Sequence, residues 1–191
     1  MLINTNLFES NNMTDLLLIN SPLFRDKVDN YDDDFLPPIG LGYIATNLKD
    51  NGGDVELLDS VAHNIPLDEI ILKINLQKPK FVGINIFSPN FELVREIIER
   101  SEKNIHFIVG GKATKDSYQE ILSFNTENSL DIVIGDGEHI VTDIVKDNLR
   151  ERPIISKENM RVFSVTQGSI YFLKDISNIP LDRIFFLMNL T

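Results

Sequence analysis

Short aliphatic runs recur along the first 135 positions of the chain and show no polar alternation. Leu16-Leu17-Leu18-Ile19 and Ile132-Val133-Ile134 are the clearest examples. A strand that is apolar on both faces is typical of a parallel sheet covered by helices on both sides. The pattern predicts five strands, over Asp15–Asn20, Asp54–Asp59, Phe81–Ile86, His106–Val109 and Asp131–Ile134.

Helical spacing of apolar residues fills the segments that follow these runs. Within Phe91–Lys103, Val94 and Ile97 share one face, opposite a face of arginine and glutamate residues. Alternating strands and helices imply right-handed crossovers and an α/β fold with a doubly wound, five-stranded parallel sheet. Residues that follow the strands then gather at one edge of the sheet, where ligands bind in such folds. The other predicted helices span Gly40–Asn51, Leu67–Leu76, Lys115–Phe124 and His139–Leu149.

The strand and helix rhythm stops near residue 150. Two β-rich arms follow, Val162–Val165 and Ile170–Phe172, and the Gln167-Gly168-Ser169 turn between them predicts a C-terminal β-hairpin extension. The apolar stretch Ile184–Met188 would be unfavourable in water unless it docks, which is consistent with either a truncation point or an interface. An interface there could join copies of this chain into a homo-oligomer. The predicted organisation is a loose leader (1–14), an α/β domain (15–150) and a hairpin with a linker or tail (151–191).

Charge and cysteine content exclude several classes of function. The net charge of −11 repels phosphate backbones and anionic lipids, which argues against nucleic acid and membrane partners. The absence of cysteine rules out disulfides, cysteine nucleophiles and an iron–sulfur cluster held by this chain. No apolar run approaches the roughly 20 residues that span a bilayer, and the first residues lack the pattern of a secretory signal, so we expect a cytoplasmic protein.

Three loops after predicted strands combine small and polar residues: Ser88-Pro89-Asn90, Gly110-Gly111-Lys112-Ala113-Thr114 and Gly135-Asp136-Gly137-Glu138. Each has a purely structural explanation, since serine caps helices and glycine permits tight turns. Together they predict a broad platform with backbone donors, suited to a large flat ligand. Neither a G-x-x-x-x-G-K-[ST] motif nor a G-x-G-x-x-G after the first strand is present, which disfavours triphosphate hydrolysis and nicotinamide binding.

Other polar groups have simpler explanations. The aspartates between Asp26 and Asp34 do not have the spacing of an EF-hand loop, so a solvated acidic loop is expected. His139, at a predicted helix start, is the histidine worth following, although a surface position explains it. Asp136 and Glu138 suit a helix amino terminus without any acid–base role. No nucleophile elbow is present, so a hydrolase is not predicted.

Five segments, taken in order, resemble the amino-terminal cobalamin-binding domain of cobalamin-dependent radical S-adenosylmethionine enzymes. The resemblance covers about residues 15 to 182. It implies a Rossmann-like, flavodoxin-like cobalamin-binding fold, with cobalamin at the carboxyl edge of the sheet and its nucleotide tail running into the sheet. The segments are Pro37–Ala45, Gly52–Asp59, Val82–Ile84, Val109–Thr114 and Asp131–Glu138.

The resemblance also implies which loops surround the cofactor. The tail's channel would be lined by Ser88, Pro89, Asn90, Gly110, Gly111, Ala113 and Thr114; Ser21, Pro22, Pro38 and Leu41 would lie nearer the corrin ring; and Gly135, Asp136, Gly137 and Glu138 would close the far side.

Two departures from related patterns shape the functional prediction. The D-x-H-x-x-G signature of histidine-ligated cobalamin is missing, so no residue is assigned as a metal ligand. The C-x-x-x-C-x-x-C cluster motif is missing too, so the chain alone is not expected to catalyse methyl transfer. The predicted function is a cobalamin-binding module that serves a radical S-adenosylmethionine methyltransferase, with the radical domain in cis or in trans.

A second hypothesis is a domain of the same fold that has lost its cofactor and serves as an interaction or regulatory module. The apolar stretch near the C-terminus favours it. It predicts bulky or charged residues where the tail should pass, and Lys112, directly after Gly110-Gly111, is the position to inspect. Under the first hypothesis, a large residue at Gly111 should block cobalamin without unfolding the protein.

Overall fold

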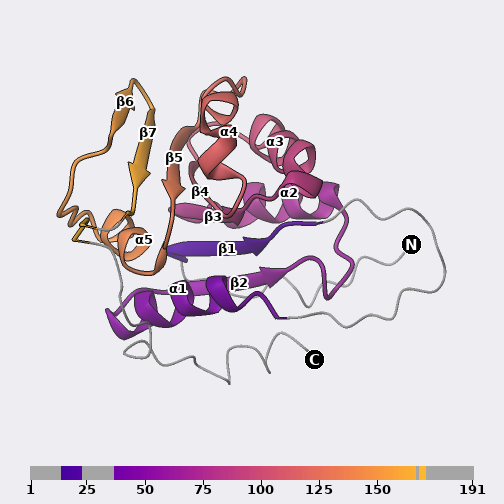
Figure 1. Ribbon diagram of the computed structural model, residues 1–191. Coiled ribbons are helices and arrows are strands. Elements are labelled where there is room, and N and C mark those ends of the chain that lie inside the picture. Colours follow the sequence, from indigo (N-terminus) through magenta and orange to yellow (C-terminus); the bar gives the residue numbers. More distant parts are fainter. Residues whose placement is uncertain (1–13, 23–36, 167, 171–191) are drawn as a thin grey trace, which may run out of the picture.

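The computed structural model describes residues 14–22, 37–166 and 168–170 (Figure 1). In this part of the chain the strands form one seven-stranded sheet in the order β2-β1-β3-β4-β5-β7-β6. All neighbours are parallel except β6 and β7. The strands are β1 (Leu16–Asn20), β2 (Val55–Asp59), β3 (Phe81–Asn85), β4 (His106–Gly110), β5 (Ser129–Ile134), β6 (Ile155–Lys157) and β7 (Met160–Ser164).

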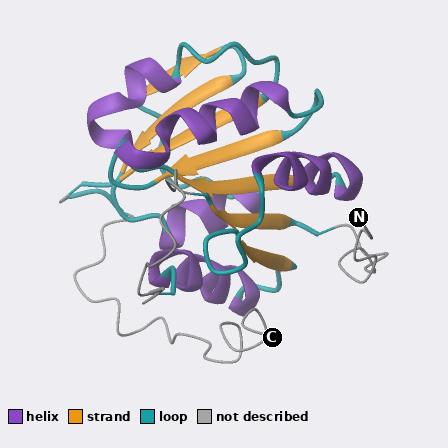
Figure 2. Ribbon diagram, turned by 90° about the vertical axis from the view of Figure 1, so that its right-hand side faces the viewer, coloured by secondary structure: helices purple, strands orange, loops and turns teal. Residues whose placement is uncertain are grey.

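The five predicted helices are confirmed, with shifts of a few residues at their ends. They cover both faces of the sheet (Figure 2). Helices α1 and α5 pack on one face, and α2, α3 and α4 pack on the other. The helices are α1 (Ile39–Asp50), α2 (Leu67–Gln77), α3 (Phe91–Arg100), α4 (Thr114–Ile121) and α5 (Glu138–Val145), with a 3-10 turn η2 (Ser88–Asn90) before α3.

Burial on both faces explains the continuous apolar strands. In β1, Leu17 and Ile19 pack toward α2 and α3, while Leu16 and Leu18 pack toward α1 and α5. All four side chains are almost completely buried. Because successive side chains of a strand alternate between faces, a strand with a helix layer on each side needs apolar residues at every position.

The prediction of a five-stranded sheet is wrong, because β7 adds to the sheet beside β5 and β6 adds beside β7. The arm predicted over Val162–Val165 corresponds to β7. Its antiparallel partner is the upstream strand β6, and the turn between them contains Glu158, whose φ is +38°. Ile170, placed in the second predicted arm, lies in a turn, and the rest of that arm lies outside the described residues.

A buried ion pair fastens β7 to the sheet. Asp131, on β5, is 1% exposed. Arg161, on β7, donates from Nε to Oδ1 at 2.7 Å and from Nη2 to Oδ2 at 2.6 Å. The Nε2 atom of His106, at the start of β4, lies 2.8 Å from the same Oδ2. This cluster therefore connects three neighbouring strands on the face that α1 and α5 cover.

The predicted leader, the acidic loop and the apolar stretch Ile184–Met188 lie outside the described residues, apart from Thr14 at the end of the leader. The division of the chain at residues 14 and 150 stays a prediction. None of the described helices combines the length and apolar character that crossing a bilayer requires.

Candidate functional site

A cavity of about 330 Å³ lies between the sheet and the amino-terminal halves of α1 and α5. Its floor is apolar and comes from four strands that lie side by side: Leu18 of β1, Gly83 of β3, Ile108 of β4 and Val133 of β5. Its walls are formed by Pro38, Ile39, Gly40, Leu41 and Ile44 at α1, by Gly137, Glu138 and Val141 at α5, and by Ile84, Asn85, Phe87, Gly110, Gly111, Gly135 and Asp136 at the strand ends.

Gly83 contributes no side chain to the floor of this cavity. A Cβ atom at Gly83 would lie 2.6 Å from Cδ2 of Leu18, so even alanine would displace a neighbouring side chain. Glycine inside a strand commonly marks a close approach of another group to the backbone. The cavity therefore offers an apolar surface against which a flat ring can lie.

The glycines at the mouth are of two kinds. Gly111 has a φ of +121°, and a Cβ atom there would lie 2.6 Å from the carbonyl oxygen of Ile86. Gly135 has a φ of +101°, and its Cβ would collide with the carbonyl oxygen of Val165. Gly110 has neither constraint, since nothing lies within 4 Å of its Cβ position. Gly111 and Gly135 are thus required by the fold, whereas Gly110 leaves open space.

Replacing Gly111 with alanine is expected to lower the free energy of unfolding by about 2 kcal/mol, because the new Cβ meets backbone that cannot move away. Gly40→Ala is the matched control. It lies in α1 with open space around its Cβ, so it should raise the free energy by about 0.5–1 kcal/mol. Urea unfolding measures both, and equal stability of Gly111→Ala and wild type would contradict the expectation. Gly111 is therefore unsuited to a test that must leave folding intact.

The structure brings together one group of the residues predicted from the family resemblance. These residues line the cavity, and their contact with a cofactor stays a prediction: Pro38, Leu41, Gly110, Gly111, Gly135, Asp136, Gly137 and Glu138.

A second group lies beside the cavity and bonds within the protein. Ser21 is buried; its N–H donates to Oδ1 of Asn85 at 2.8 Å and its hydroxyl to the carbonyl of Asn85 at 2.7 Å. The side chain of Asn90 donates to the Ser21 hydroxyl and accepts from the N–H of Phe87 at 2.7 Å. The hydroxyl of Thr114 lies 2.7 Å from the carbonyl oxygen of Gly111 and 3.0 Å from that of Val133. These residues shape the loops that surround the cavity.

The remaining predicted residues also lie outside the cavity lining. Ser88 and Pro89 are exposed on η2, Pro22 is half-buried after β1, and Ala113 is buried with its N–H on the carbonyl of Ile86 at 3.3 Å. Their predicted contact with the cofactor stays a prediction. Sequence reasoning missed the floor of the cavity, although glycine at position 83 inside an apolar strand was a usable signal.

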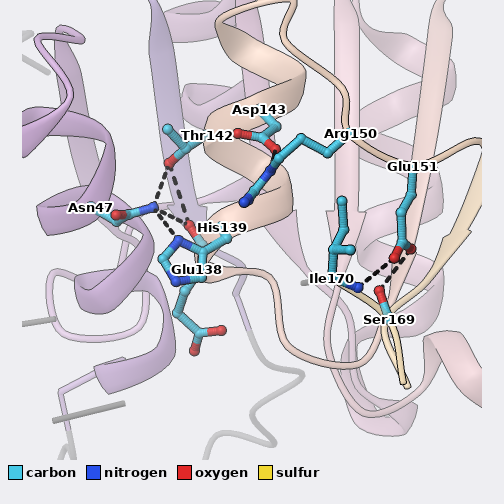
Figure 3. Close-up of polar contacts among 9 residues, drawn as sticks. All are labelled: Asn47, Glu138, His139, Thr142, Asp143, Arg150, Glu151, Ser169 and Ile170. Carbon is cyan, nitrogen blue, oxygen red and sulfur yellow. Dashed lines mark hydrogen bonds and ion pairs between the residues drawn. The ribbon is translucent and has the colours of Figure 1, made fainter. Parts of the chain in front are cut away.

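The amino terminus of α5 is held against α1 by Asn47 (Figure 3). Its Nδ2 donates to the backbone carbonyl of Glu138 at 2.7 Å and to Oγ1 of Thr142 at 3.0 Å, and lies 3.4 Å from Nδ1 of His139. Burial lowers the pKa of His139, with Arg150 adding to the fall and Asp143 opposing it. His139 does not line the cavity.

The carboxyl group of Glu138 points away from Asn47, His139 and Thr142 (Figure 3). Its Oε2 atom is buried and has no hydrogen-bond partner among the described residues. Burial raises the pKa of Glu138; a hydrogen bond from its own backbone N–H opposes this, and the charge of Asp136 adds to the rise. The described residues contain no cluster of three or more His, Asp or Glu side chains that would hold a metal ion.

The model of the B12-binding domain family matches residues 32–145 of the chain, which include most of the cavity lining. The chain belongs to the B12-binding domain family. This membership confirms the resemblance to a cobalamin-binding domain that the loops indicate. No curated protein sequence matches this B12-binding domain.

Two solved structures similar to this B12-binding domain are of the radical S-adenosylmethionine methyltransferase TsrM from Kitasatospora setae. The one with tryptophan substrate and a S-adenosylmethionine analog is 21% identical, with a TM-score of 0.52 over 70% of this chain, and the match covers 25% of the TsrM chain. The one with cobalamin and a [4Fe-4S] cluster is 23% identical, with a TM-score of 0.49 over 70% of this chain and 26% of that one. The first shows a shared fold, and this chain spans about a quarter of the TsrM chain.

Proposed function

We propose that this B12-binding domain holds cobalamin, with the nucleotide tail in the cavity and the corrin ring over the carboxyl edge of the sheet. The apolar cavity, whose floor includes Gly83, is the observation that carries the proposal. Its volume of about 330 Å³ is at the lower end of the range for small-molecule sites, which suits an aromatic base and leaves no room for a corrin ring.

The residues present fit such a tail. The floor around Gly83 and Ile108 and the wall formed by Leu41 and Ile44 are apolar, as an aromatic ring requires. Gly110 leaves the mouth open on the side where the ring system would emerge. These residues would bind and orient the cofactor, and cobalamin itself supplies the methyl transfer or electron chemistry when bound.

Lys112 does not argue for the hypothesis of a lost cofactor. That hypothesis predicts bulky or charged side chains in the tail's path. Lys112 is exposed and does not line the cavity, so its side chain does not occupy the space that the tail would need.

We also propose that the domain works with a radical S-adenosylmethionine domain, in the same polypeptide or as a separate protein. The likeness in fold to one part of the radical S-adenosylmethionine methyltransferase TsrM supports this pairing. Because the chain contains no cysteine, the thiolates of a radical-generating cluster have to come from that partner.

Titration of the purified protein with hydroxocobalamin, followed by gel filtration, tests the proposal. We expect the corrinoid spectrum to elute with the protein at about one equivalent. Loss of all colour from the protein peak at tens of micromolar protein would contradict the proposal.

A further inference from the structure

Glu138 stands out within the cavity because one of its two carboxyl oxygens, Oε2, has no hydrogen-bond partner in the described part of the chain. Among the described residues that line the cavity, Asp136 and Glu138 carry the only charged side chains. Asn85, the other polar side chain there, bonds to Asn20 and Ser21. The buried Oε2 of Glu138 bonds to nothing in the described part of the chain.

The surroundings explain why this carboxyl group is left for a ligand. Asn47, the nearest amide on α1, donates to the backbone carbonyl of Glu138, to Thr142 and toward His139 (Figure 3). The described wall from α1 that faces Glu138 is apolar, and Lys112 lies outside the lining. No cation among the described residues therefore reaches Glu138 inside the cavity.

Oε2 of Glu138 is already out of contact with water, and a ligand that fills the cavity also removes water from the part of this half-buried side chain that is still exposed. A buried carboxylate with no cation, and with only its own backbone N–H as a donor, is costly, whereas a protonated carboxyl is neutral and can donate one hydrogen bond itself. The amino terminus of α5 favours the anion, and Asp136 opposes it. Burial is the largest influence on this group in the free protein, and the ligand increases burial further.

We propose that Glu138 takes up a proton from solvent as the cavity fills, and that its O–H then donates a hydrogen bond to an acceptor on the ligand. The matching acceptor is an unprotonated nitrogen of an aromatic heterocycle, such as the base of a corrinoid nucleotide tail. No covalent bond to the ligand forms. The inference rests on the proposed function and adds that Glu138 takes up a proton when the cofactor binds.

Calorimetric titration with hydroxocobalamin tests this, in two buffers of different ionisation enthalpy and over pH 5 to 8. The proteins are wild type, Glu138→Gln and the control Glu120→Gln, which removes an exposed carboxylate on α4. Wild type and Glu120→Gln should take up as much as one proton more per cofactor than Glu138→Gln. Relative to Glu138→Gln, their affinity should fall by up to about tenfold per pH unit as the pH rises.

The glutamine variant isolates Glu138 because any protonation of the corrinoid itself is common to all three proteins. Its amide still donates a hydrogen bond, so at pH 5 it should bind within a few-fold of wild type. Equal proton uptake by wild type and Glu138→Gln, or loss of binding in a folded Glu138→Gln, would overturn this inference and leave the proposed function standing. Absence of binding by every protein at every pH would overturn both.

Discussion

Replacing Arg161 with alanine is expected to lower the free energy of unfolding by about 3 kcal/mol, because Asp131 then stays buried without its main cation. Asp131 is 1% exposed, and both of its oxygens accept from Arg161. His106 contacts only Oδ2. A buried carboxylate that loses a bidentate partner cannot turn to water, so the free energy of the folded state rises.

Urea unfolding at pH 7 measures this loss. Lys103→Ala is the control, since Lys103 pairs with Glu127 at 2.7 Å on the surface with both side chains about 70% exposed. Exposed pairs of this kind contribute less than about 1 kcal/mol, so the control should remain close to wild type. A loss in Arg161→Ala as small as in Lys103→Ala would show that the pair does not hold β7 to the sheet.

The same carboxylate makes stability depend on pH in acid. Burial alone would raise the pKa of Asp131, but hydrogen bonds from His106 and Arg161 outweigh it and hold the pKa below its ordinary value. The unfolded chain therefore binds the proton more readily than the folded chain. The contribution of ionised Asp131 to the free energy of unfolding is complete above about pH 4, the ordinary range of aspartate. It is lost as the pH falls through the lowered pKa of the folded state. Asp131→Asn should flatten this part of the stability curve.

The pairing of β7 with β6 is a part of the fold that local sequence patterns do not predict. Gln167-Gly168-Ser169 has the residues that turns favour, so the pattern predicts that Val162–Val165 pairs with the arm that follows this turn. In the described residues, the neighbours of β7 are β5 and the upstream strand β6. The actual turn uses Glu158 with a φ of +38°, a conformation that glutamate rarely adopts. Arg161 also interrupts the apolar run of β7, and its partner Asp131 lies 30 positions away. Pairing over such a distance cannot be read from local composition.

The sequence predicts only part of the candidate site, namely its loops. Loops such as Gly110-Gly111 and Gly135 to Glu138 could be predicted, because glycine after a strand marks the carboxyl edge of a parallel sheet. For the floor, Gly83 signals a close approach to the backbone, but a strand buried on both faces does not reveal which face carries the cavity. Ser21 and Asn90 satisfy one another through hydrogen bonds, and by residue type they look the same as ligand-binding groups.

Replacing Gly110 with phenylalanine is expected to weaken hydroxocobalamin binding by at least about 100-fold, some 2.7 kcal/mol. Gly110 ends β4, and strand alternation places it on the same face as Ile108 in the cavity floor. With nothing within 4 Å of the Cβ position, the new side chain enters open space at the mouth. The ring then occupies volume that the cofactor's tail needs.

Folding should survive this change, because Gly110 lacks the positive φ and the backbone collision of Gly111. Gln119→Phe places the same ring on the exposed surface of α4, away from the cavity, and should bind as wild type does. Gel filtration with hydroxocobalamin and thermal unfolding compare the two variants. Full binding by a folded Gly110→Phe would show that the tail lies elsewhere, whereas loss in both variants would indicate a nonspecific effect of the added ring.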